Sequence, residues 1–210
     1  MAVLFELIGY VVYAGMALIA LWGAFCVILV WRRVGQTRFR DEDELDDFFD
    51  ELDEQLEKGD YAAAVDVCED DRRAMPQLAL FAIENRELPP GRVQRRLVER
   101  FQQDVLADIE RRLSWVSTVI KSAPMIGLFG TVIGMMGAFS NLSSGAKVDT
   151  GQMAADIMFA LITTACGLAI AVPLILASNS INIRLRSMED MIGLGLSRLS
   201  DSLSLSRTPE

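Results

Sequence analysis

Three long stretches of the chain contain no charged residue. They cover residues 7–31, 122–146 and 157–183, and they are 25, 25 and 27 residues long. A helix of about 20 apolar residues is enough to cross the hydrocarbon core of a bilayer. Each stretch can therefore span a membrane, and the sequence predicts an all-α integral membrane protein with three transmembrane helices.

The basic residues next to these stretches predict how the three helices are oriented. The first stretch is followed by Arg32, Arg33, Arg38 and Arg40, and the third by Arg184 and Arg186. The second stretch is preceded by Arg111, Arg112 and Lys121. The loop between the second and third stretches carries only Lys147 and Asp149. Because Lys and Arg collect on the cytoplasmic side, we expect an N-terminus that faces outward and a cytoplasmic C-terminus. The first stretch is too long for a signal peptide and lacks its basic start.

The charges are concentrated in the segment between the first and second stretches. Residues 32–116 hold 22 acidic and 14 basic residues, out of a total formal charge of −9. This division predicts four regions: an outward N-terminus with the first transmembrane helix (1–31), a cytoplasmic helical domain (32–117), a transmembrane hairpin (118–183) and a cytoplasmic helix extension with a tail (184–210). The second and third helices are expected to extend into the cytoplasmic bundle.

Within the cytoplasmic domain, the hydrophobic pattern predicts several helices. Residues 41–60 are acidic with apolar residues at helical spacing, which predicts an amphipathic helix that breaks at Gly59. A further helix is expected to begin over 61–69 and to end before Pro76, and a short one is expected over 78–85. A turn at 87–91 and one long helix from Arg92 into the second span should follow. The third span is expected to continue to near Gly193, and the serine-rich tail 197–210 to be disordered.

The composition excludes several classes of protein. The chain has no histidine, so it has no His general base and no imidazole metal ligand. Its three cysteines, Cys26, Cys68 and Cys166, do not have the spacing of a metal site or a disulfide framework. The large polar segment is acidic and would repel phosphates, which argues against nucleic-acid binding. We therefore expect no enzyme activity, no metal site and no cofactor.

The second and third stretches carry small residues at helical spacing, which the first does not. Such faces let the backbones of two membrane helices approach closely. The residues expected to pack in this way, with two prolines, are Pro124, Gly127, Gly130, Gly134, Gly167 and Pro173.

Three threonines and one aspartate are the candidate polar residues of this hairpin. Counting from the outer loop at about 1.5 Å per residue puts Thr131 and Thr164 near the middle of the bilayer. Threonines 131, 163 and 164 are compatible with a polar ring in an assembly, and equally with bonding to their own helix or between helices. Asp156 lies at the outer end, where it suits a helix start more than a functional carboxylate.

The run Ala123-Pro-x-x-Gly-Leu-Phe-Gly-Thr-Val-x-Gly134, followed by Ala160-Leu-Ile-Thr-Thr164-Ala-x-Gly-Leu168 and by Ala171-Val-Pro173, resembles the MotA/TolQ/ExbB proton-channel family, in its three-span ExbB and TolQ branch. The resemblance covers residues 118–180, about a third of the chain. It implies a bacterial inner-membrane protein in a homopentamer, whose second and third helices line a pore around two copies of an ExbD- or TolR-like single-span partner.

The resemblance also implies a role for particular residues. Thr131 and Thr164 match the pore-facing threonines of the family, and the partner's aspartate would carry the proton. Many relatives have a glutamate where this chain has Phe159, so Asp156 would serve as the outer proton site, or no acid is needed there. The work performed would be TonB-type import, Tol-type envelope maintenance or motility, and the alternative is a non-conducting membrane scaffold.

Overall fold

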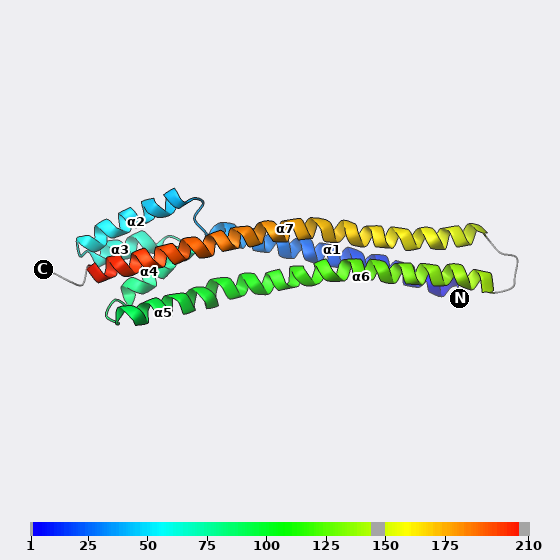
Figure 1. The fold of residues 1–210 in the computed structure, drawn as a ribbon, viewed down its shortest axis with the longest axis horizontal. Coiled ribbons are helices and arrows are strands. Elements are labelled where there is room, and N and C mark those ends of the chain that lie inside the picture. Colours follow the sequence, from blue (N-terminus) through cyan, green and yellow to red (C-terminus); the bar gives the residue numbers. More distant parts are fainter. Residues whose placement is uncertain (1, 144–149, 206–210) are drawn as a thin grey trace. The chain divides into compact units, whose positions relative to one another are not determined.

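The computed structural model describes residues 2–143 and 150–205, and every element within these ranges is a helix (Figure 1). The elements are α1 (Ala2–Thr37), α2 (Glu42–Glu57), α3 (Tyr61–Glu69), α4 (Ala74–Glu84), α5 (Pro90–Arg100), the π-helix η1 (Phe101–Leu106), α6 (Ala107–Ser143) and α7 (Thr150–Leu205). Three stretches are long and apolar enough to cross a membrane: Leu7–Thr37, Gly91–Ser140 and Thr150–Ser202. The all-α class with three membrane-length helices is therefore confirmed.

The chain divides into two compact units. One, here called the apolar unit, consists of Met1–Leu29 and Arg112–Ser180, and the other, the charged unit, consists of Val30–Arg111 and Ile181–Glu210. The apolar unit contains most of α1 together with the α6–α7 hairpin. The charged unit contains α2 to α5, η1 and the C-terminal part of α7.

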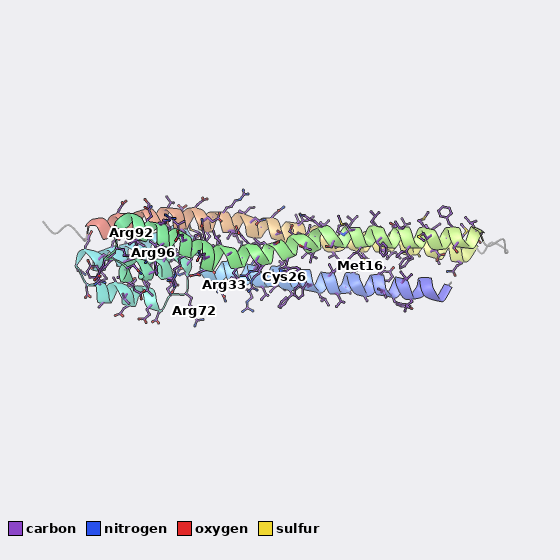
Figure 2. The ribbon with its side chains drawn as sticks, turned by 90° about the horizontal axis from the view of Figure 1, so that it is seen from below. Met16, Cys26, Arg33, Arg72, Arg92 and Arg96 are labelled. Atoms are coloured by element: carbon purple, nitrogen blue, oxygen red, sulfur yellow. The ribbon has the colours of Figure 1, made fainter. Side chains whose placement is uncertain are left out.

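In the apolar unit, α1 packs against both helices of the hairpin. Val12 and Met16 of α1 form a buried cluster with Ile133 of α6, and Met16 is labelled in Figure 2. At Gly23, an added Cβ would lie 2.8 Å from Leu174 Cδ1 of α7 and 2.9 Å from Val119 Cγ1 of α6. The glycine therefore gives α1 the room to approach both partners at this point without displacing their side chains.

The charged unit is built on the amphipathic helix α2, as its sequence predicts. Its buried stripe comprises Leu45, Phe48, Phe49, Leu52 and Leu56. The helix ends where expected, because Gly59 adopts a positive φ of 70°, a conformation that residues with a Cβ rarely adopt. Asp60 then caps α3, its side chain accepting a hydrogen bond from the Ala63 amide at 3.1 Å.

One arginine joins the end of α7 to α2. Arg198 donates to Asp53 at 3.0 Å, to Asp50 at 2.6 Å and to Asp46 at 3.2 Å, and its guanidinium lies 5.1 Å from the centre of the Phe49 ring. The Ser202 hydroxyl donates to the other oxygen of Asp53 at 2.7 Å. The three carboxylates lie on successive turns of one side of α2, so a single cation holds that side against α7.

Several predicted helix boundaries were wrong. Helix α7 does not end near Gly193 but continues to Leu205, so residues 197–205 are helical instead of disordered, and residues 206–210 lie outside the described residues. Helix α4 begins at Ala74 and takes Pro76 into its first turn, where a missing N–H costs little. Helix α5 begins at Pro90, within the predicted turn. The predicted continuous helix from Arg92 is interrupted by the π-helical turn η1.

Candidate functional site

The α6–α7 hairpin is held together by a row of glycines on α6. An added Cβ would lie 2.8 Å from the Thr163 carbonyl oxygen at Gly127, and 2.7 Å from the Asp156 carbonyl oxygen at Gly134. At Gly130 it would overlap the Thr163 side chain. These separations are shorter than a Cβ tolerates, so the small residues are what allow the two backbones to meet.

The same contact is made from the α7 side. At Gly167, an added Cβ would lie 2.7 Å from the Ala123 carbonyl oxygen and 3.2 Å from Pro124 Cα. The two prolines predicted at this interface, Pro124 and Pro173, lie inside α6 and α7 without ending either helix. The sequence did not identify Gly137, where an added Cβ would be 3.2 Å from Asp156 Oδ2. Its spacing of three residues from Gly134 is the signal that would have found it.

Two of the three candidate threonines bond across the hairpin to one carbonyl group. The Thr163 hydroxyl lies 3.3 Å from the Gly127 carbonyl oxygen and 2.8 Å from that of Ala160, and the Thr164 hydroxyl lies 3.2 Å from the Gly127 oxygen. Thr163 is fully buried, whereas Thr164 is partly exposed. Thr163 therefore joins the two helices within one chain, while Thr164 also reaches the surface of the hairpin.

Thr131 has a different environment. Its hydroxyl donates to the carbonyl oxygen of Leu128 in its own helix at 2.6 Å, and the side chain is partly exposed. It lies one turn along α6 from Gly127, the residue to which Thr164 bonds. Thr131 and Thr164 thus lie within about 6 Å of each other along the helix axis. Each hydroxyl donates its hydrogen to a backbone carbonyl, and its oxygen can still accept further hydrogen bonds.

Asp156 is not a helix-start residue, contrary to the interpretation that the sequence favoured. Helix α7 is already formed at Thr150, which puts Asp156 in its second turn. The Gln152 side-chain amide donates to Asp156 Oδ1 at 3.3 Å, and the carboxylate lies over Gly137 of α6. The acid is therefore part of the α6–α7 interface.

Phe159 packs against α1. Its ring meets that of Tyr13 edge to face, with 5.4 Å between centroids, and an added Cβ on Gly9 would be 3.3 Å from the Phe159 ring. An aromatic ring at this position therefore joins α7 to α1.

The charged unit contains a cysteine without the properties of a nucleophile. Cys68 is completely buried, and this burial, assisted by the negative charge of Asp71, raises the pKa of its thiol to about 12. A thiol with so high a pKa remains protonated and unreactive near neutral pH. Among the described residues, no group of three or more Cys, Asp or Glu side chains has the geometry of a metal site.

The hairpin with its glycine face is a pair of membrane-length helices in close contact, as in a multi-span membrane protein. Over residues 72–193, more than half of the chain, the sequence matches the MotA/TolQ/ExbB proton channel family, and the chain belongs to this family. Membership of a family of channels agrees with the expectation that the chain is not an enzyme.

Curated relatives carry TolQ and ExbB names. The chain is 45% identical over 89 residues to the Tol-Pal system protein TolQ of Haemophilus influenzae, covering 42% of this chain and 39% of the relative. It is 40% identical over 81 residues to the biopolymer transport protein ExbB of Neisseria gonorrhoeae, covering 37% of each. It is 39% identical over 71 residues to a putative ExbB-like protein 2 of Helicobacter pylori, covering 34% of this chain and 47% of the relative. The chain spans less than half the length of these relatives.

Proposed function

We propose that the chain is the proton-conducting subunit of a bacterial inner-membrane motor of the ExbB and TolQ type. The observation that carries the proposal is the pair of partly exposed hydroxyls, Thr131 and Thr164, within one helical turn of each other in otherwise uncharged segments. A hydroxyl oxygen can accept a hydrogen bond from a proton-carrying water, and the hydroxyl hydrogen can be donated to the next acceptor. In an assembly, these two positions would line the path.

The proton carrier itself is proposed to come from a second protein. Residues 122–146 and 157–183 contain no charged side chain, so this chain offers no group at mid-depth that titrates near neutral pH. An ExbD- or TolR-like partner with one transmembrane helix, present as a dimer within a homopentamer of this chain, would supply the acid. The periplasmic part of that partner, acting with a TonB-like protein where one is present, would perform TonB-type import, Tol-type envelope maintenance or motility.

Proton flux in vesicles tests the path directly. Vesicles that contain the chain and its partner are compared with vesicles that contain Thr131→Ala or Thr164→Val. We expect each substitution to reduce flux, because the hydroxyl that passes or holds a proton is lost. Thr118→Ala is the matched control: this threonine is also on α6, is also exposed, and also bonds its own helix, at 3.0 Å to the Ser114 carbonyl. Flux that is unchanged in both variants would rule out the proposed path.

Asp156 is proposed as the outer proton site, because this chain has Phe159 at the position where many relatives have a glutamate. Its carboxylate is located near the outer end of the hairpin in the expected topology, and Gln152 orients it by a hydrogen bond. Asp156→Asn keeps the size of the side chain and its capacity to form hydrogen bonds but removes its negative charge. We expect lower flux in the same vesicles.

The second candidate function is a non-conducting scaffold, and Phe159 is the observation that favours it. Its ring fills the contact between α7 and α1 with a group that cannot carry a proton. A scaffold would assemble with the partner in mild detergent but would give no flux above that of partner-only vesicles. Assembly with the partner in detergent, measured together with proton flux in vesicles, therefore separates the two functions.

A further inference from the structure

One side of α2 carries carboxylates that no cation in the described part of the chain neutralises. Residues 41–57 contain eleven acidic and no basic residues. Arg198 binds Asp46, Asp50 and Asp53, Arg73 binds Glu44, and Lys58 binds Glu54. Six acids of this segment have no ion pair among the described residues. Three of them are exposed and lie one helical turn apart, opposite the buried stripe: Asp43, Asp47 and Glu51. We call these three the acidic row.

Helix α5 carries the complementary feature. Val93 and Leu97 are buried, and Arg92 and Arg96 project from another side of the helix, one turn apart and exposed (Figure 2). The other arginines of α5 are engaged within the chain, Arg95 with Glu99 and Arg100 with Asp104. Arg92 and Arg96, here called the arginine pair, form no ion pair within the described part of the chain.

The two features lie on different sides of the charged unit, so they do not meet within one chain. Contacts among the four short helices follow chain order, from α2 to α3, from α3 to α4 and from α4 to α5. Figure 1 shows α2 and α5 on opposite sides of α3 and α4. A head-to-tail contact between identical copies requires two different, complementary patches on different sides of the molecule, and such contacts form a ring where the rotation between copies closes.

We infer that the arginine pair of one copy binds the acidic row of a second copy of this chain. Both features repeat every four residues, about 6 Å along a helix, so two arginines can face two of the three carboxylates at once. Anionic lipid would neutralise only the arginine pair, whereas a second copy neutralises both features. Exposed ion pairs add little affinity and mainly select orientation and register. The contact therefore determines which side of each copy faces its neighbour.

This inference rests on the proposed homo-oligomer, and carbodiimide cross-linking tests it separately. Carbodiimide joins an amine to a carboxylate that it touches, and it does not react with arginine. The variant Arg92→Lys/Arg96→Lys keeps the charge and makes the pair reactive. In purified full-length protein in mild detergent, we expect cross-linked dimers in which position 92 or 96 is joined to Asp43, Asp47 or Glu51, as mapped by mass spectrometry.

Two matched variants complete the experiment. Adding Asp43→Asn, Asp47→Asn and Glu51→Gln to the lysine variant is expected to abolish these cross-links. Arg95→Lys alone, on the same helix, is expected to give a bond to Glu99 within one chain only. Raising the salt concentration before the reagent is added should reduce the dimers, because exposed ion pairs are screened.

Three results would overturn the inference. In the first, the protein is oligomeric by native mass spectrometry but positions 92 and 96 are not joined to the acidic row. The proposed oligomer would then be retained, and the proposed contact would be rejected. In the second, the protein is monomeric, and both the inference and the proposed assembly fail. In the third, the dimers form in zwitterionic nanodiscs and disappear when phosphatidylglycerol is included, which would assign the arginine pair to lipid.

Discussion

At the residue scale, the spacing between α6 and α7 depends on glycines, which have no side chain. Gly127, Gly130 and Gly134 each face backbone or side-chain atoms of α7 at distances that exclude a Cβ. Helices in lipid gain little from the hydrophobic effect, so their association depends on such close packing and on interhelical hydrogen bonds. The bonds from Thr163 and Thr164 to the Gly127 carbonyl supply the second contribution.

Gly134→Ala is expected to destabilise the hairpin. The new Cβ would lie 2.7 Å from the Asp156 carbonyl oxygen and 2.8 Å from Ala160 Cβ, and backbone atoms cannot rotate out of the way. Overpacking of this kind costs about 1–3 kcal/mol, which outweighs the gain of about 1 kcal/mol from the better helix propensity of alanine. The melting temperature in detergent, followed by circular dichroism, should fall. Gly15→Ala is the control, because nothing lies within 4 Å of its added Cβ; equal effects of the two substitutions would contradict the packing argument.

Cys68 is expected to make stability depend on pH above 9. The ordinary pKa of the thiol is 9.0, and burial followed by the charge of Asp71 raises it to about 12 in the folded state. Below pH 9 the thiol is protonated in both states, but above it the unfolded chain loses the proton first, so unfolding becomes easier as the pH rises towards 12. The free energy of unfolding should fall more steeply with pH for the wild type than for Cys68→Ala. Parallel curves for the two proteins would exclude this contribution.

At the scale of helices, the position of α2 depends on a cation near the other end of the chain. Arg198 contacts three carboxylates of α2, of which Asp53 is the most shielded, with 23% of its side chain exposed against 69% for Asp46 and 74% for Asp50. Exposed ion pairs contribute little because water screens them. The bond to Asp53 and the contact with the Phe49 ring are therefore the main contributions.

Arg198→Ala is expected to loosen α2 by about 1 kcal/mol. Amide hydrogen exchange should become faster in α2 and in the last turns of α7, because three carboxylates lose their shared cation and repel one another. Arg186→Ala removes an arginine from the same helix that is exposed and has no ion pair among the described residues, and it should leave exchange in α2 unchanged. If the two variants gave the same exchange pattern, the contact with α2 would not be the reason.

The helices also show where sequence patterns were sufficient and where they were not. The stripe of α2 and the break at Gly59 follow from local spacing and from one backbone conformation, and both were predicted. The continuation of α7 was not predicted, because Gly193 and Gly195 are poor helix formers. At Gly195, however, an added Cβ would lie 2.9 Å from Met75 Sδ and 3.1 Å from Phe49 Cε2. That glycine serves packing between distant segments, which no local pattern reveals.

The threonines gave the same lesson at the candidate site. The sequence identified Thr131, Thr163 and Thr164 by residue type and estimated depth, and only the resemblance to the family set Thr131 and Thr164 apart from Thr163. Only the position of α6 relative to α7 distinguishes the buried Thr163 from the partly exposed Thr164. Asp156 could not be placed from the sequence either. The sequence favoured a helix start for it, but α7 begins at Thr150, which puts Asp156 in the second turn.

At the scale of the whole molecule, the orientation in the membrane is a prediction that proteolysis can check. The basic residues between 32 and 112 are expected on the cytoplasmic side because Lys and Arg collect there. Trypsin should therefore cleave within residues 32–112 in inverted inner-membrane vesicles but leave these residues intact in spheroplasts with a sealed membrane, where Lys147 of the outer loop is the expected site of cleavage. Spheroplasts permeabilised with detergent are the control for access. Cleavage within residues 32–112 in intact spheroplasts would reverse the proposed topology.

The glycine row has a consequence for how such a hairpin evolves. Each glycine of α6 meets a particular residue of α7, so the space at one position is set by the pair and not by either residue alone. In relatives where the equivalent of Gly130 carries an alanine, the equivalent of Thr163, whose side chain the added Cβ would overlap, should have become glycine. Coupled substitutions at these two positions in an alignment of the family would therefore be evidence of the contact between the helices.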